Sequence, residues 1–251
     1  MGDFSISGSG RCSGGKYEKI SISGSGHIDG DVTCNSLGIS GSGHIDGNVE
    51  CAGPVRVSGS ARMSGDMRAK SFSTSGSAHI DGSLDCETGG VSGSAHISGS
   101  IRAGEFTTHG SLGARTVEAE HFTARGGFSI TELLSADEID VVIGGNCRAG
   151  EVGGKNIKVR RGEMNSILGW LFGAGRRGGF ECTAIEGDRV DIEYVKADVV
   201  RGDVVTVGPG CKIGRVEYKT SCTADFDSDI GERVQTGGPR PPGSPGSPEL
   251  L

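Results

Sequence analysis

The chain has 251 residues, of which 47 are glycine and only 5% are aromatic, and its formal net charge is −7. So few large apolar side chains cannot fill a wide globular core, and we expect a narrow core of small aliphatic residues. The acidic balance and the lack of a basic stripe with interleaved aromatic residues argue against nucleic acid as a partner. Because no apolar run follows Met1, we expect neither a secretory signal nor a transmembrane helix, and we expect a cytoplasmic protein.

A Gly-rich unit recurs along the N-terminal part of the chain. Successive copies begin at a nearly constant spacing, at Ile22, Ile39, Val57, Thr74 and Val91. Within a copy, short alternating runs such as Val32-Thr33-Cys34 are typical of strands, and Ser-Gly and Asp-Gly pairs supply tight corners. A fixed period this short predicts a solenoid, in which each repeat buries its apolar side only against its neighbours.

These strands and corners predict an all-β, single-stranded parallel β-helix with about 17 residues per turn. The uneven spacing of apolar positions favours a right-handed coil over the even left-handed hexapeptide form. Equivalent positions in successive turns should form ladders with rungs about 4.8 Å apart. One predicted inward ladder is Cys34, Cys51, Ala69, Cys86 and Ala103, and one predicted outward ladder is His27, His44, Arg62, His79 and His96. We interpret the eight cysteines as reduced, buried thiols.

The chain divides into four predicted segments. Residues 1–163 are expected to form the N-terminal turns, beginning with a slightly irregular one. Residues 164–180 interrupt the period as an apolar helical or loop insert. Residues 181–220 resume it, because Val190 and Val207, and Tyr194 and Cys211, are each separated by the same period as the N-terminal copies. Residues 221–251 are acidic and then rich in Pro, Gly and Ser, and we expect them to be disordered.

The insert carries the most apolar stretch of the chain. If Asn165 or Ser166 caps a short helix, one face of that helix holds Ile167, Leu168, Leu171 and Phe172, with Trp170 beside them. The stretch is too short to span a bilayer, but it could lie at a membrane surface, the inner face of the cell membrane in particular. The alternative is packing on the solenoid or on a partner protein.

Repeated His and Asp residues raise the question of chemistry. His27 with Asp29, His44 with Asp46 and His79 with Asp81 suggest a metal or acid–base site, but repetition in several turns favours a solvated polar ladder. We single out no catalytic residue, no metal ligand and no cofactor. A β-helix transferase or metal-dependent lyase is therefore a remote alternative.

The two ends of a solenoid expose unpaired backbone and core, and these must be capped or paired with another chain. We predict polymer contacts at the first turn, through Phe4 and Ile6, and at the last turns. The C-terminal contact residues are predicted to be Val207, Ile213, Val216 and Tyr218. End-to-end association that does not close produces a filament.

The Gly-rich turns and the block V-D-I-E-Y-V-K-A-D-V-V-R-G-D-V-V-T-V-G-P-G-C-K-I-G-R-V-E-Y, from Val190 to Tyr218, resemble the bactofilins, and in particular the larger Gram-positive type. The resemblance implies a right-handed β-helix that polymerises end to end without nucleotide. It also implies a cytoskeletal scaffold for cell shape, envelope assembly or motility, with other bactofilins or envelope and motility proteins as partners. Many bactofilins carry an apolar N-terminal membrane-targeting peptide, which Met1 to Ile6 do not resemble, so the insert is the substitute candidate.

We therefore expect a structural, filament-forming scaffold rather than an enzyme. The alternative is a β-helical adaptor or binding module that collects partners along its faces and its Pro-rich tail without polymerising.

Overall fold

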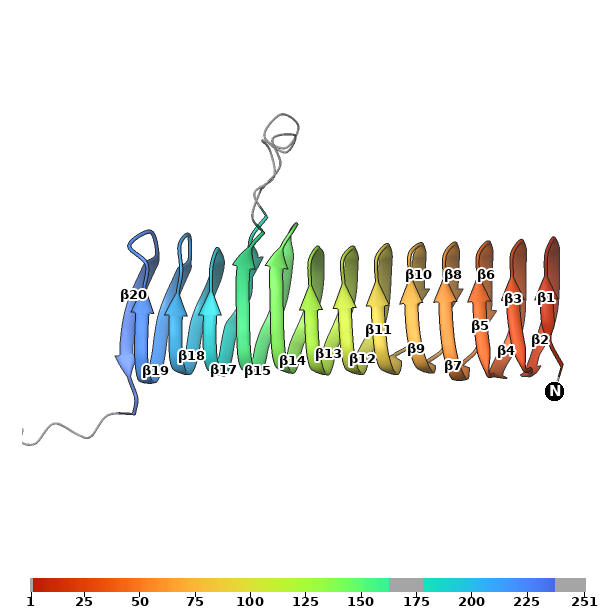
Figure 1. Ribbon diagram of the computed structural model, residues 1–251, viewed down its shortest axis with the longest axis horizontal. Helices are drawn as coiled ribbons and strands as arrows, with labels where there is room; N and C mark the ends of the chain where they lie inside the picture. Colours follow the sequence, from red (N-terminus) through yellow and green to blue (C-terminus); the bar gives the residue numbers. More distant parts are fainter. Residues whose placement is uncertain (1, 163–177, 238–251) are drawn as a thin grey trace, which may run out of the picture.

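The computed structural model describes residues 2–162 and 178–237, and over these residues the protein is one elongated rod of stacked strands with no helix (Figure 1). The strands are β1 (Phe4–Ile6), β2 (Ser9–Lys16), β3 (Lys19–Ile22), β4 (Ser25–Cys34), β5 (Ser36–Ile39), β6 (Ser42–Asp46), β7 (Val49–Val57), β8 (Ser60–Met63), β9 (Met67–Thr74), β10 (Ser77–Ile80), β11 (Leu84–Val91), β12 (Ser94–Thr108), β13 (Ser111–Ala124), β14 (Gly127–Ile143), β15 (Cys147–Arg161), β16 (Phe180–Glu181), β17 (Ala184–Ile192), β18 (Val195–Val207), β19 (Lys212–Ala224) and β20 (Asp229–Gln235).

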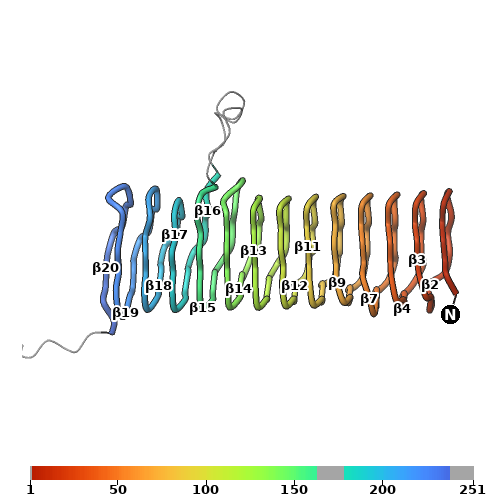
Figure 2. Tube along the Cα trace, viewed as in Figure 1, coloured from red at the N-terminus to blue at the C-terminus, as the bar shows by residue number. Residues whose placement is uncertain are grey.

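Successive turns of the rod pair with each other in parallel along its whole described length. His27 stands over His44, and Cys34 over Cys51, so residues one period apart occupy equivalent positions as predicted. The chain makes about 13 turns of about 17 residues. In Figure 1 the strands of the near face run upward while the chain advances from right to left, which is a right-handed coil. The predicted β-helix is therefore confirmed, and Figure 2 shows its successive coils as a single row.

Each turn has three faces, and each face points two residues inward. In one turn Leu37 and Ile39 belong to the first face, Gly43 and Ile45 to the second, and Val49 and Cys51 to the third. All six are buried, and the residues between them point outward. Six small or aliphatic positions per turn make a continuous core along the rod, which explains how a chain so poor in aromatic residues folds.

Stacked glycines form the corner between the first and second faces. A Cβ added to Gly41 would lie 2.0 Å from the carbonyl oxygen of Gly24, and one added to Gly59 would lie 2.0 Å from that of Gly41. No side chain fits at these separations, since real Cβ atoms essentially never approach closer than 3.0 Å. The Ser-Gly pairs of the repeat are therefore required by the close approach of one corner to the next.

Short polar side chains hold the corner between the second and third faces. Asp31 Oδ1 accepts a hydrogen bond from the backbone N–H of Asn48, whose Oδ1 accepts one from the N–H of Asp66, both at 2.8 Å. Asp66 Oδ1 accepts from the N–H of Ser83 at 2.7 Å. Because each turn satisfies a backbone donor of the next, this corner fixes the register along the N-terminal half.

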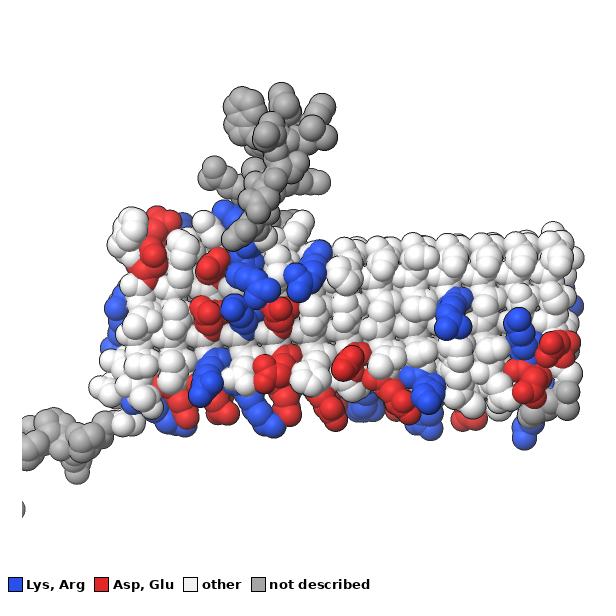
Figure 3. Space-filling model, viewed as in Figure 1, with Lys and Arg blue, Asp and Glu red and all other residues white. Residues whose placement is uncertain are grey.

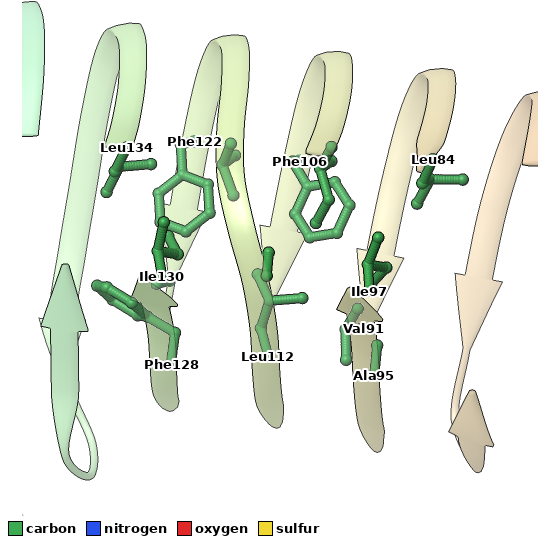
Figure 4. Close-up of a cluster of buried hydrophobic side chains, with 14 of the residues drawn as sticks. Leu84, Val91, Ala95, Ile97, Phe106, Leu112, Phe122, Phe128, Ile130 and Leu134 are labelled. Carbon is green, nitrogen blue, oxygen red and sulfur yellow. The ribbon is translucent and has the colours of Figure 1, made fainter. Parts of the chain in front are cut away.

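Larger side chains enter the core in the middle of the rod. Phe106 and Phe122 stack in register with their ring centroids 6.5 Å apart, and Phe128 meets Phe122 edge to face at 5.7 Å (Figure 4). Gly89 precedes this pair in the same ladder, and a Cβ there would lie 2.3 Å from the Phe106 ring. Gly89 stands between Phe72 and Phe106 in this ladder, and its missing side chain makes room for the Phe106 ring.

The C-terminal turns keep the three faces but change the period. Ile139 pairs with Ile157 and Val141 with Val159, as their equal spacings predicted. Val190, however, pairs with Val205 rather than Val207, so the prediction that Val190 and Val207 are one period apart is wrong. The turn is shorter because two of its corners are shorter. The buried residues Ile192 and Val195, and likewise Ala197 and Val200, are three positions apart, whereas Val57 and Ala61 at the equivalent corner are four apart.

The apolar insert leaves the rod at the corner between the first and second faces. Its residues Ile167, Leu168, Trp170, Leu171 and Phe172, and the helix predicted for them, lie outside the described residues. After the insert, Gly178 lies in the glycine corner again. A Cβ added there would lie 2.1 Å from Gly145 O, as at the other corner glycines. Val159 consequently pairs with Ile192, and the parallel sheet continues without a break. The insert can vary without disturbing the core.

One charged side chain closes the base of the insert. The guanidinium carbon of Arg161 lies 3.4 Å from the centroid of the Tyr194 ring, and its Nη2 donates to Gly178 O at 3.4 Å. The backbone N–H of Arg161 donates to Glu193 Oε2 at 3.2 Å. Tyr194 is the one described non-glycine residue with positive φ, 53°, and Gly210, at the same position of the next turn, also has positive φ, 68°. These contacts join the two ends of the insert to the next turn.

The C-terminal boundary predicted at residue 220 is wrong. Residues 221–224 complete β19, and β20 adds part of a further turn, with Ile213 paired to Ile230 and Val216 to Arg233. This segment looked disordered because acidic residues fill its outward positions, while its inward positions carry few apolar residues. The predicted Pro-rich tail beyond it, residues 238–251, lies outside the described residues.

Candidate assembly interface

Within the described ranges, both ends of the rod have a strand edge without a partner strand. At the N-terminal end, β1 pairs with β3 and β2 with β4, and the opposite edge of each is open. At the C-terminal end, β20 pairs with β19 and leaves its own far edge open. Open edges of parallel strands present rows of unpaired N–H and C=O groups that can accept another chain.

The N-terminal tip is mainly apolar. Its inward positions hold Phe4 and Ile6 on the first face, Cys12 on the second and Tyr17 on the third, and all except Ile6 are only partly buried. The Phe4 and Tyr17 rings pack across the tip with centroids 5.3 Å apart, and Tyr17 Oη donates to Ser13 O at 2.9 Å. The two aromatic rings therefore cover part of the first core layer but leave a partly exposed apolar surface.

The C-terminal tip is more polar. Its inward positions include the partly buried Ala224 and Ile230 and the exposed Arg233, which stands over Val216. Arg233 lies near the Cys222 thiol and lowers its pKa, although burial has the larger, opposite effect and the pKa is raised overall. Phe226, at the last corner, is 98% exposed, the highest exposure of any described large apolar residue.

The predicted contact residues occupy different depths. Phe4, and Tyr218 at the other end, are partly buried near the tips, and Ile6 is 7% exposed. Val207, Ile213 and Val216 are fully buried because Ala224, Ile230 and Arg233 stand over them. Their predicted role in polymer contacts is untested, and any contact at this end goes through the residues that cover them.

Charge is distributed unevenly along the rod. On the face shown in Figure 3, the upper part of the N-terminal half is almost free of charged residues, and charges gather along the lower edge and in the C-terminal half. Near the C-terminal tip, Arg215 pairs with Glu217 at 2.8 Å and with Glu232 at 3.4 Å. These exposed pairs contribute little to stability, but they make this end the more hydrophilic one.

The remaining ladders lie as the sequence predicted. His27, His44, Arg62, His79 and His96 share one outward ladder, and Cys34, Cys51, Ala69, Cys86 and Ala103 share one inward ladder. All eight cysteines are free thiols, but the prediction that all are buried is wrong, because Cys12, Cys182 and Cys222 are only partly buried. Burial raises the pKa of Cys86 to about 12, which keeps this thiol protonated and unreactive at neutral pH.

Comparison with known proteins supports the sequence resemblance. Residues 1–85 match the family model of the bactofilins, described as polymer-forming cytoskeletal. These first turns are similar to a bactofilin domain. The uncharacterized protein YhbF of Bacillus subtilis (strain 168) is 40% identical to the chain over 85 residues, 34% of this chain and 33% of YhbF. YhbE of the same organism is 32% identical over 104 residues, 40% of this chain and 42% of YhbE.

The chain thus spans less than half the length of the curated relatives it matches. No solved structure matches it. The bactofilin match covers the regular N-terminal turns, and the same parallel pairing continues through the irregular turns beyond it. The described residues include no helix long and apolar enough to cross a bilayer.

Sequence reasoning missed several residues at the two tips of the rod. Tyr17 stands one turn before Cys34, so the ladder itself could have identified it. Ile230 follows Ile213 by one full period, and that period could have found it. Phe226 carries no such signal, because corner positions do not alternate and its exposure depends on where the rod ends.

Proposed function

We propose that this protein is a structural scaffold that polymerises end to end into filaments without nucleotide. The observation that supports this is the pair of open strand edges at the tips, each beside a partly exposed core. Stacking a second rod on such an edge would continue the same parallel sheet and the same core ladders. The match of residues 1–85 to the polymer-forming cytoskeletal bactofilin model supports the same proposal.

The energetics favour a contact made by both backbone and side chains. A docked rod would satisfy the unpaired edge groups of one tip and bury Phe4, Tyr17 and their neighbours. Burial of one large apolar side chain contributes about 1.5–3 kcal/mol, and together with the backbone pairs this offsets the entropy lost on association. Because each rod has two tips and the contacts lie along the rod axis, association at both tips produces a filament rather than a closed ring.

We further propose that the insert carries a lateral contact, either with a membrane surface or with a partner protein. Its two ends, Arg161 and Gly178, leave the rod at a corner, away from both tips. A contact made there leaves the tips free for polymerisation. Deletion of residues 163–177 should preserve filaments, and it should abolish flotation with anionic vesicles if the partner is a membrane.

Sedimentation and negative-stain microscopy of the purified full chain, without nucleotide, test the polymer. We expect filaments above a critical concentration, and for the Phe4→Asp variant only above a critical concentration roughly thirtyfold higher. A matched control is Ser5→Asp, because Ser5 is the exposed, outward neighbour of Phe4 in the same strand. A monomer at all concentrations and salt levels would contradict the proposal and favour a non-polymerising adaptor.

A further inference from the structure

The outward His ladder contains a cluster that polymerisation does not use. On the second face of the N-terminal turns, His27 and His44 stack with ring centroids 4.8 Å apart. The ligand atoms of His27, His44 and Asp46 all lie within 4.8 Å of one another. We propose that these three side chains bind a divalent transition metal ion of the Zn²⁺ class on the surface of the rod.

The nitrogens and carboxylates converge on one point. His44 Nε2 lies 2.6 Å from Asp46 Oδ1, and His27 Nε2 lies 2.9 Å from Asp46 Oδ2. The carboxylate of Asp46 thus receives one imidazole nitrogen on each oxygen. Two imidazole nitrogens and a carboxylate are a common zinc donor set, in which water completes the tetrahedron.

The His27 imidazole has more acceptors than it can serve. Its Nε2 lies 2.9 Å from Asp46 and 3.0 Å from Asp29, but a single N–H can donate well to only one of them. A metal ion bound by both imidazoles and by Asp46 would remove this competition.

The site is open to solvent and is built on a rigid surface. The side chains of His27 and His44 are 32% and 37% exposed, so an ion can enter without any opening of the core. Both histidines come from paired strands, β4 and β6, whose register fixes their separation. Such preorganisation lowers the cost of bringing the ligands together.

The same ladder supplies a natural comparison. His79 and His96 stack with ring centroids 5.0 Å apart, and His79 Nε2 lies 2.6 Å from Asp81. Here the second carboxylate is missing, since Ser98 takes the place of Asp, and Arg62 pairs with Asp81 at 2.9 Å. Both pairs of histidines are stacked and polar, but only His27 and His44 have a carboxylate, that of Asp46, within reach of both imidazoles.

Arg11 opposes the metal. Its Nη2 lies 2.6 Å from Asp29 Oδ1 and 3.4 Å from His27 Nε2, so its positive charge repels an incoming cation. Removal of this charge should tighten binding. A purely structural role of the histidines would not produce such a gain.

Titration calorimetry of the full chain with ZnCl₂ at neutral pH tests the site, with MgCl₂ and CaCl₂ as oxygen-preferring comparison ions. We expect one Zn²⁺ per chain at this site. In His44→Ala and Asp46→Asn the dissociation constant for Zn²⁺ should rise by more than about tenfold, which is the smallest loss usually seen when a residue hydrogen-bonded to a metal ligand is removed. Arg11→Ala should bind more tightly. His96→Ala is the matched control and should bind as the native chain does.

Two further measurements keep the result unambiguous. The thermal unfolding temperature in EDTA should be the same for all variants, because the substitutions lie on the outer surface. If His44→Ala does not fold, Asp46→Asn tests the same ligand set. The Co²⁺-loaded protein should lack a thiolate-to-cobalt charge-transfer band, which excludes the cysteines. Failure of the native chain to bind Zn²⁺, binding unchanged in both ligand variants, or a thiolate band would each overturn the proposal.

Discussion

The two tips of the rod differ although the same repeat builds both. The N-terminal tip places Phe4, Ile6 and Tyr17 at inward positions beside an open edge. The C-terminal tip places Ile230 there, but also the exposed Arg233. The N-terminal tip therefore exposes apolar core residues, whereas the C-terminal tip is a hydrophilic strand edge. Charged residues at an edge commonly protect a sheet against uncontrolled pairing.

This difference indicates where assembly draws its free energy. Apolar burial should dominate at the N-terminal tip, and backbone pairing with local charge should dominate at the C-terminal tip.

The largest effect concerns the glycine corner and separates the interior of the rod from its tip. Gly41→Ala places a Cβ 2.0 Å from Gly24 O, and we expect a loss of about 3 kcal/mol in unfolding free energy. Gly8→Ala is the matched control, because nothing lies within 4 Å of its added Cβ. Chemical denaturation of the two variants should therefore differ clearly, and equal midpoints would contradict a close-packed corner.

Phe4→Asp tests the apolar tip. Loss of one large buried ring at the contact should weaken association by about 2 kcal/mol, which raises the critical concentration roughly thirtyfold. Pelleting across a concentration series measures this. Unchanged pelleting would show that the N-terminal tip does not take part.

Arg233→Leu should make the C-terminal tip resemble the N-terminal one. The substitution places an apolar side chain over Val216, and the gain of about 1 kcal/mol should lower the critical concentration roughly fivefold. The same pelleting series detects it. A higher critical concentration would instead mean that Arg233 binds an acidic group of the neighbouring rod.

The smallest effect concerns surface charge at the C-terminal tip. Glu232 lies 3.4 Å from Arg215 and is more than half exposed, so Glu232→Gln should change stability by less than about 0.5 kcal/mol. Thermal unfolding at low and high salt checks this. A larger change would show that this pair is part of an assembly contact.

The sequence is sufficient for the fold where the repeat is regular. The near-constant period of the N-terminal copies predicted the ladders of His27 and Cys34, because equal spacing places equal residues at equal positions. The turn from Val190 to Val205 was mispredicted, since shortened corners change the period without changing the apolar pattern. The last turn was missed because Arg233 occupies an inward position, and a tip position need not be apolar.

If the rods join tip to tip, the length of one rod sets the axial repeat of the filament. About 13 turns at a strand spacing of about 4.8 Å give a rod of about 60 Å. We predict by electron cryomicroscopy a filament one rod wide, with a layer line at about 4.8 Å and one chain per about 60 Å of its length. Rods packed side by side, with strands running along the filament axis, would contradict it.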